Sequence, residues 1–329
     1  MTNNSDWIRL RNKLVRDLSL YFSSSNAKTH LLQYYALVDA AQVPELRNHT
    51  SLVKHLRGVS LFSLTEEHGI EKYGPILVPL RDSDDKDINS ILIRAMKRGW
   101  TVSWLSAALS LMELAEHLAQ YLNGRLADGC EVLVRYYDPR VLPAFFDIMG
   151  RNVVDGLMIP IGQWSWWDRQ MNFITRVGGG APFIDDSVEI NIPQEVQKAF
   201  SKLATEDLIH GMLLEHCDKD EFSSWLPHTL YLAIKRHVIA AKQVGLTSLT
   251  NIYLYVSLAM RVHPNFYSLL SLKSENFNFF KRETDLPQLV LGVTDDNWDR
   301  LGNDGRNELD ELRQALTNEV CKDAEQIKG

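Results

Sequence analysis

The sequence predicts an α/β N-terminal lobe, built on a mixed and largely parallel sheet with flanking helices, followed by an all-α C-terminal lobe. In the first part of the chain, short apolar runs typical of buried strands alternate with segments of helical periodicity. After Pro193 the periodicity is helical only. We therefore place an α/β domain at residues 1–190 and a helical lobe at residues 191–329, with an acidic C-terminal tail from about residue 284.

The parallel sheet is predicted from the alternation of strands and helices, since a helix is the usual connection between parallel strands. The clearest helix covers residues 107–122, where an apolar face lies opposite a polar face with Glu113, Glu116 and His117. The expected strands cover residues 34–40, 76–80, 100–105 and 131–137, and the expected helices cover residues 7–22, 45–57, 87–98, 107–122 and 139–149.

The pattern changes between residues 156 and 192, where extended segments predict antiparallel structure at one edge of the sheet. This region contains three closely spaced tryptophans. Because side chains alternate along a strand, Trp164 and Trp166 are expected on one face and Trp167 on the other.

Residues 128–142 combine a turn, a strand and the start of a helix. Asp138 followed by Pro139 is a helix-start signal, because Asp accepts free N–H groups and Pro loses no hydrogen bond at the first position. Arg135 lies inside the strand and needs an acidic partner if it is buried. Asp39, at the carboxyl end of an earlier strand, is the best candidate for that partner.

The same residues allow an alternative interpretation as an enzyme site. Ligands of open α/β sheets bind at the carboxyl ends of the strands, where Asp39 and Asp138 are expected. Together with Arg140, these carboxylates could perform acid–base chemistry on a small polar substrate. The sequence leaves open whether the cluster of Asp39, Arg135, Asp138, Pro139 and Arg140 is structural or binds a ligand.

In the C-terminal lobe, the helix expected at residues 249–262 is apolar nearly all round, and the helix expected at residues 228–243 carries several apolar residues. Such helices either form a core or present an apolar face to a partner. Both possibilities stay open for six candidate partner-binding residues: Tyr231, Ile234, Val238, Ile252, Tyr255 and Val256.

The composition of the chain argues against several classes of function. The net charge is −7 at pH 7 and the pI is about 5.8, which argues against a general nucleic-acid binder or a protein that binds anionic membranes. No apolar run approaches the roughly 20 residues of a membrane span, and the N-terminus does not resemble a signal peptide. The three cysteines are far apart and fit no metal-ligand spacing, so we expect a cytoplasmic protein without metal or cofactor.

Three motifs occur in a characteristic order: Tyr35–Ala41 (YALVDAA), Gly74–Val78 (GPILV) and Arg135–Leu142 (RYYDPRVL). In this order and spacing they resemble the adaptor, or chaperone, proteins of the bacterial type VI secretion system, over about residues 33–160. The N-terminal domain of those adaptors was first catalogued as a domain of unknown function. The helical lobe also resembles their variable C-terminal region.

The resemblance implies a protein that binds a secreted effector in the cytoplasm and assists its loading onto the VgrG spike protein. It also implies recognition between proteins rather than catalysis.

Overall fold

A computed structural model describes the backbone of residues 4–25, 32–43, 57–67, 69–80, 92–93, 95–96, 98–181, 188–218, 221–271 and 285–322. The chain forms two compact units. The sheet unit covers residues 14–202, and the helical unit covers residues 1–13 and 203–329. The expected helix at 45–57 lies outside the described residues except for its last position, and the helix at 87–98 lies there only in part.

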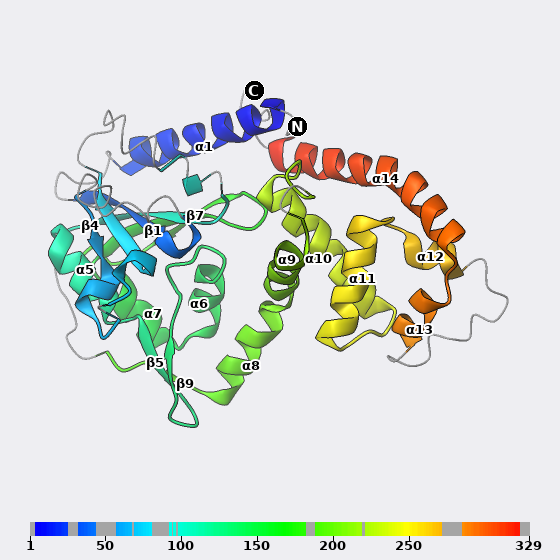
Figure 1. Cartoon of the computed structure of the whole chain (residues 1–329). Coiled ribbons are helices and arrows are strands. Elements are labelled where there is room, and N and C mark those ends of the chain that lie inside the picture. The colour runs from blue at the N-terminus through cyan, green and yellow to red at the C-terminus, as the bar shows by residue number, and fades with distance from the viewer. Residues whose placement is uncertain are drawn as a thin grey trace. The chain divides into compact units, whose positions relative to one another are not determined.

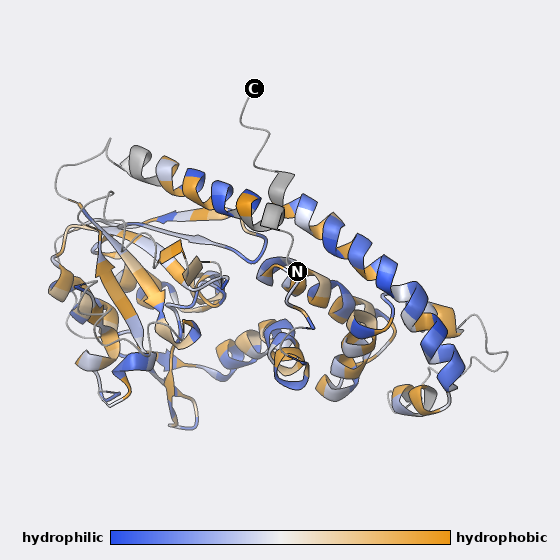
Figure 2. Cartoon of the chain, turned by 45° about the horizontal axis from the view of Figure 1, so that its top comes forward, coloured by the Kyte–Doolittle hydropathy of each residue, from blue (hydrophilic) through white to orange (hydrophobic). Residues whose placement is uncertain are grey.

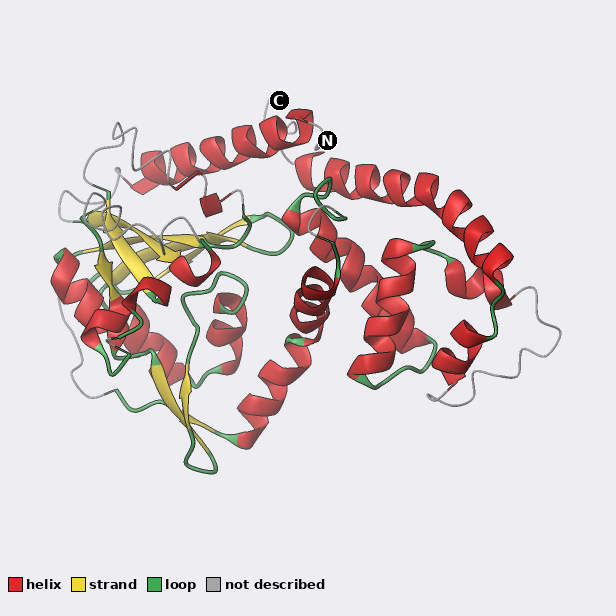
Figure 3. Ribbon diagram, in the orientation of Figure 1, coloured by secondary structure: helices red, strands yellow, loops and turns green. Residues whose placement is uncertain are grey.

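The described strands all lie between residues 33 and 192 (Figures 1 and 3). They are β1 (Gln33–Asp39), β2 (Val59–Ser60), β3 (Pro75–Pro79), β4 (Val102–Ala107), β5 (Asn123–Leu126), β6 (Glu131–Leu133), β7 (Ile161–Trp167), β8 (Phe173–Val177) and β9 (Asn191–Ile192). Helix α1 (Asn4–Ser25) precedes these strands and α8 (Gln194–Leu203) follows them. Between the strands lie α5 (Leu111–Ala119), α6 (Leu142–Ile148) and α7 (Arg151–Met158), with the short 3-10 helices η1 (Ala40–Gln42), η2 (Leu61–Leu64) and η3 (Glu71–Tyr73).

The prediction of a largely parallel sheet is wrong. The main sheet has six strands in the order β2-β3-β1-β4-β7-β8, and each neighbouring pair is antiparallel. The described parallel pair, β5 with β9, belongs to a small three-stranded sheet. The central strand β1 lies between β3 and β4, and both run antiparallel to it. The alternation of strands and helices along the sequence therefore did not determine the direction of the strands.

Both faces of the main sheet are buried. Tyr35, Leu105 and Trp164 point to one face, where they join the large apolar cluster with α5, α6 and α7. On the other face, Trp104 and Trp167 make an edge-to-face contact at 6.3 Å. Helix α1 lies over this second face, where the Trp167 indole donates a hydrogen bond to Asp17 at 3.1 Å. The tryptophans of β7 thus divide between the two faces as predicted.

Helix α5 is shorter than expected and begins with a capping box. The backbone N–H of Ser110 donates to Glu113 Oε2 at 2.8 Å, and the Ser110 hydroxyl accepts from the Glu113 N–H at 3.5 Å. The assignment of His117 to the polar face is wrong, because its side chain is fully buried and lies 3.0 Å from the Leu157 carbonyl oxygen.

The strand expected at residues 131–137 is also corrected. Strand β6 ends at Leu133, is half exposed and pairs with β5 in the small sheet. The following Tyr136 lies in a turn, is fully buried and donates a hydrogen bond to the Leu118 carbonyl oxygen at 2.5 Å. The aromatic residues that suggested a strand therefore belong to the core beneath α5.

The helical unit contains α9 (Thr205–His216), α10 (Pro227–Gln243), α11 (Leu249–Arg261), α12 (Phe266–Ser271), α13 (Asp285–Leu291) and α14 (Asp295–Lys322). Its apolar core includes residues of α9, α10, α11 and α14. Figure 2 shows that α14 is hydrophilic over most of its length, which matches the acidic tail of the sequence. The described helices include none that is both long and apolar enough to cross a membrane.

Close packing of α14 against the end of α11 predicts opposite effects for two glycines. A Cβ at Gly305 would lie 2.0 Å from the Val262 carbonyl oxygen, whereas a Cβ at Gly302 would have no atom within 4 Å. We expect Gly302→Ala to stabilise the protein by about 0.5–1 kcal/mol through helix propensity. We expect Gly305→Ala to destabilise it by about 1–3 kcal/mol through overpacking. Urea unfolding of both variants measures the difference, and equal stabilities would contradict this packing of α14.

Candidate functional site

The first predicted site residue, Asp39, ends β1 with its side chain fully buried. Its Oδ1 accepts a hydrogen bond from the Ala41 backbone N–H at 3.1 Å and thereby caps η1. Its Oδ2 accepts from the Gln42 side-chain amide at 2.5 Å. Burial raises the pKa of Asp39 above its usual range, although the positive charge of Arg135 acts in the opposite direction. The ionised carboxylate therefore depends on its cationic partner.

Arg135 supplies that partner, as the sequence predicts. Its Nη2 lies 2.9 Å from Asp39 Oδ2 and 3.2 Å from Asp138 Oδ2. The arginine side chain is 41% exposed, while both carboxylates are buried. Its guanidinium also lies 5.9 Å from the centre of the Tyr137 ring. One exposed cation thus joins the end of β1 to a segment that follows β6.

The second carboxylate closes a turn rather than starting a helix. Asp138 Oδ1 accepts from the Arg140 backbone N–H at 2.9 Å, and Asp138 Oδ2 lies 2.7 Å from Arg140 Nη2. Pro139 is buried within this turn. Helix α6 begins only at Leu142, so the predicted helix start is displaced by several residues. The backbone carbonyl of Asp138 still accepts the Leu142 N–H at 2.9 Å and leads the chain into the helix.

We call Asp39, Arg135, Asp138 and Arg140 the ion-pair cluster. Both of its acids, Asp39 and Asp138, form ion pairs with arginines. Sequence reasoning missed two contributors to the cluster. Gln42 could have been found, because it lies three residues after Asp39, within reach of a capping turn. Arg169, whose Nη1 donates to the Arg140 carbonyl oxygen at 2.8 Å, carries no such signal because it comes from a distant segment. The described residues include no group of three or more His, Cys, Asp or Glu that could hold a metal ion.

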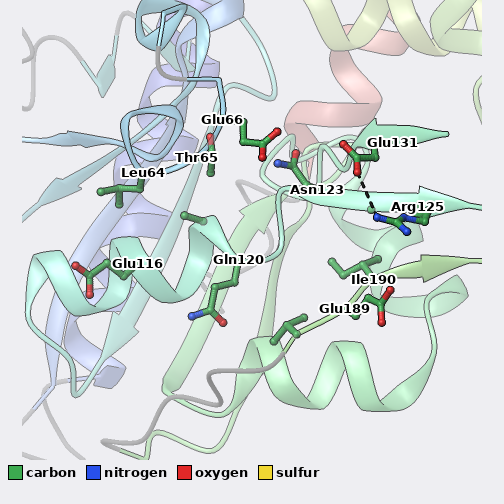
Figure 4. A pocket seen from close by; sticks show the side chains of 13 residues that line it. Leu64, Thr65, Glu66, Glu116, Gln120, Asn123, Arg125, Glu131, Glu189 and Ile190 are labelled. Atoms are coloured by element: carbon green, nitrogen blue, oxygen red, sulfur yellow. Dashed lines mark hydrogen bonds and ion pairs between the residues drawn. The ribbon is translucent and has the colours of Figure 1, made fainter. Parts of the chain in front are cut away.

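A second feature is a surface hollow of about 580 Å³ in the sheet unit (Figure 4). We call it the acidic hollow, because four glutamates and one arginine are its charged lining residues. The lining comes from the end of η2, helix α5, the small sheet and the segment before β9. It consists of Leu64, Thr65, Glu66, Glu116, Ala119, Gln120, Asn123, Gly124, Arg125, Glu131, Val188, Glu189 and Ile190. Sequence analysis placed Glu116 on a polar helix face but did not predict this site.

The candidate partner-binding residues of the helical unit lie inside it. Tyr231, Ile234, Val238, Ile252, Tyr255 and Val256 are each at most 5% exposed. All except Tyr231 belong to the same apolar cluster between α10 and α11. A partner could contact them only after these helices had separated, so their role in binding stays a prediction.

The motifs of the sheet unit also match a known family. Residues 34–154 match the model described as "Domain of unknown function (DUF4123)". This family is associated with effector adaptors of type VI secretion systems. The match contains the whole ion-pair cluster and ends within α7, before β7. No curated protein and no solved structure is significantly similar to the chain.

The ion-pair cluster predicts strong coupling between Arg135 and Asp39. Arg135→Met should lower the free energy of unfolding by about 2–4 kcal/mol, because it removes a countercharge from the buried carboxylate. Asp39→Asn in the same chain should recover part of that loss. Arg125→Met is the control, since Arg125 and Glu131 form an exposed ion pair, and should cost less than about 1 kcal/mol. Denaturant unfolding tests the cycle, and strictly additive losses would contradict the pairing.

Two buried histidines of α10 predict acid sensitivity of the helical unit. Burial lowers the pKa of His228 to about 3, with help from Lys13, and burial and Arg236 lower the pKa of His237 to about 4. Both pKa values lie below the ordinary histidine value of about 6.5. As the pH falls, these histidines therefore bind protons in the unfolded chain before they do so in the folded protein. The free energy of unfolding should fall as the pH drops from about 6.5 towards 4, by about 3 kcal/mol per histidine.

Hydrogen exchange of the α10 amides, corrected for intrinsic rates, measures this loss of stability. His228→Leu with His237→Leu should flatten the pH dependence, whatever the variant's stability at neutral pH. His216→Leu is the control, because His216 is exposed and should leave the slope unchanged. An unchanged slope in the double variant would show that other groups cause the acid sensitivity.

Proposed function

We propose that this protein is an adaptor of a type VI secretion system that binds a secreted effector in the cytoplasm and assists its loading onto the VgrG spike protein. The observation that carries the proposal is the DUF4123 match over residues 34–154, which includes the three motifs of the sequence. The family's association with effector adaptors supports a role in recognition between proteins.

The chemistry of the ion-pair cluster favours this role over the enzyme alternative. A general acid or base must reach a proton of its substrate at hydrogen-bond distance. Asp39 is fully buried and contacts Arg135, while Asp138 contacts both Arg135 and Arg140. These contacts fix backbone segments of the sheet unit, which supports a structural role. We therefore propose that the protein acts without catalysis.

Co-expression with an effector encoded beside its gene tests the proposal. We expect a complex that co-elutes in size-exclusion chromatography at micromolar concentration and keeps the effector more soluble than it is alone. Addition of purified VgrG should then give a larger species. In the native cell, deletion of this chain should abolish delivery of that effector and leave delivery of unrelated effectors unchanged. Normal delivery without the chain, together with no co-elution, would refute the adaptor role.

A further inference from the structure

Strand β8 forms one outer edge of the main sheet, and its neighbour on the inner side is β7. The opposite edge is β2, which has only two residues, whereas β8 has five. Proteins commonly protect an edge strand by shortness, proline, lysine or a bulge, because its free backbone groups can pair with another chain. Over its described length, Phe173–Val177, β8 contains no proline, lysine or bulge.

The pairing with β7 determines which backbone groups of β8 point outward. Just after the strand, the Gly178 N–H donates to the Gly162 carbonyl oxygen at 3.0 Å. Hydrogen-bonded and non-hydrogen-bonded pairs alternate along an antiparallel ladder, so the backbone of Arg176 also faces β7. The N–H and C=O groups of Thr175 and Val177 therefore point away from β7. They make no backbone hydrogen bond within the described part of the chain.

The side chains along this edge leave apolar surface that an added strand would cover. Val177 is 72% exposed and Ile174 is 37% exposed. Ile174 pairs with Trp166, whose ring lies 5.6 Å from Phe146 of α6, so Ile174 lies on the face covered by α6. Side chains of neighbouring strands contact each other on the same face, and an apolar residue beside Ile174 would bury it.

The same face carries a cation without a carboxylate. The guanidinium of Arg176 lies over the Phe146 ring, 4.4 Å from its centre. Arg176 is half-buried and forms no ion pair with the residues that the structure describes. A carboxylate on a strand added beside β8 would accept charge-assisted hydrogen bonds from this guanidinium.

We propose that the outer edge of β8 binds an extended, acidic segment of a protein partner as an additional strand. The proposal rests on the proposed adaptor function and assigns one recognition surface to the sheet unit. Backbone hydrogen bonds to Thr175 and Val177 supply affinity, and the side chains beside them supply specificity. Ile174 and Arg176 are two residues apart on one face, so the fitting segment has an apolar residue and an Asp or Glu at the same spacing.

A second copy of this chain fits the edge less well, because β8 contains no acidic residue. No register of β8 against β8 places a carboxylate of the strand beside Arg176. One register would place two arginines next to each other, which is unfavourable. The unpaired charge therefore favours a different protein as the partner.

A peptide titration of the full chain, followed by NMR, tests the inference. The probe is an acetylated Thr-Val-Thr-Glu-Thr-Val-Thr amide, which presents valine and glutamate on one face in either strand direction. The control peptide has lysine in place of glutamate. The glutamate peptide should shift the amide signals of Thr175 and Val177 and should bind at least about fivefold more tightly than the lysine peptide. Equal affinities, or shifts confined to other residues, would overturn the inference.

Variants of the edge separate the backbone contribution from the charge. Val177→Pro removes an outward N–H, which an edge strand tolerates, and should weaken glutamate-peptide binding about tenfold. Val177→Ala keeps that N–H and should change binding less than about threefold. Arg176→Gln should abolish most of the preference for glutamate over lysine. Arg151→Gln is its control, because Arg151 is an exposed arginine of α7.

The oligomeric state tests the second-copy alternative. The native chain and the Val177→Pro variant should have the same mass in analytical ultracentrifugation. Dimers of the native chain that Val177→Pro abolishes would overturn the inference, because the edge would then pair with a second copy.

Hydrogen exchange in the complex separates this inference from the adaptor function. An effector or VgrG that co-elutes with the native chain should slow exchange of the Thr175 and Val177 amides and should bind Val177→Pro about tenfold more weakly. If both partners co-elute but leave these amides and that affinity unchanged, the edge is not the recognition surface and the adaptor function stands. If neither partner binds the native chain, the adaptor function fails, and the peptide titration alone decides whether the edge binds an acidic strand.

Discussion

The ion pair between Asp39 and Arg135 holds together the part of the sheet unit that matches the family. Asp39 ends the central strand β1 and is fully buried, so its charge is tolerated only beside a cation. Arg135 comes from the segment after β6 and also contacts Asp138. Through Asp138 and Arg140, the same contacts shape the turn that leads into α6. A single guanidinium thereby links the end of β1 to the turn that leads into α6.

The remaining architecture follows from burial of the main sheet on both faces. Trp164 and Trp104 occupy opposite faces, and each contacts other aromatic rings. Aromatic pairs of this kind contribute large apolar areas and favour edge-to-face geometry. Helices α5, α6 and α7 cover one face, and α1 covers the other.

The sheet unit uses its acidic residues in two ways. Asp39 and Asp138 are buried and neutralised by arginines, which suits a structural role. Glu116 and Glu189 are exposed around the acidic hollow and form no ion pair with the described residues, since Arg125 of the lining pairs with Glu131.

Periodicity and residue chemistry were sufficient to predict several local features. They identified the apolar runs of β1, β3 and β4, the amphipathic α5, and the need of Arg135 for an acidic partner, because these depend on short-range pattern and the cost of buried charge. Strand direction, the short extent of β6 and the burial of His117 depend instead on which segments meet in space. The acidic hollow likewise joins Glu66, Glu116 and Glu189 from distant parts of the chain, and no local pattern encodes that proximity.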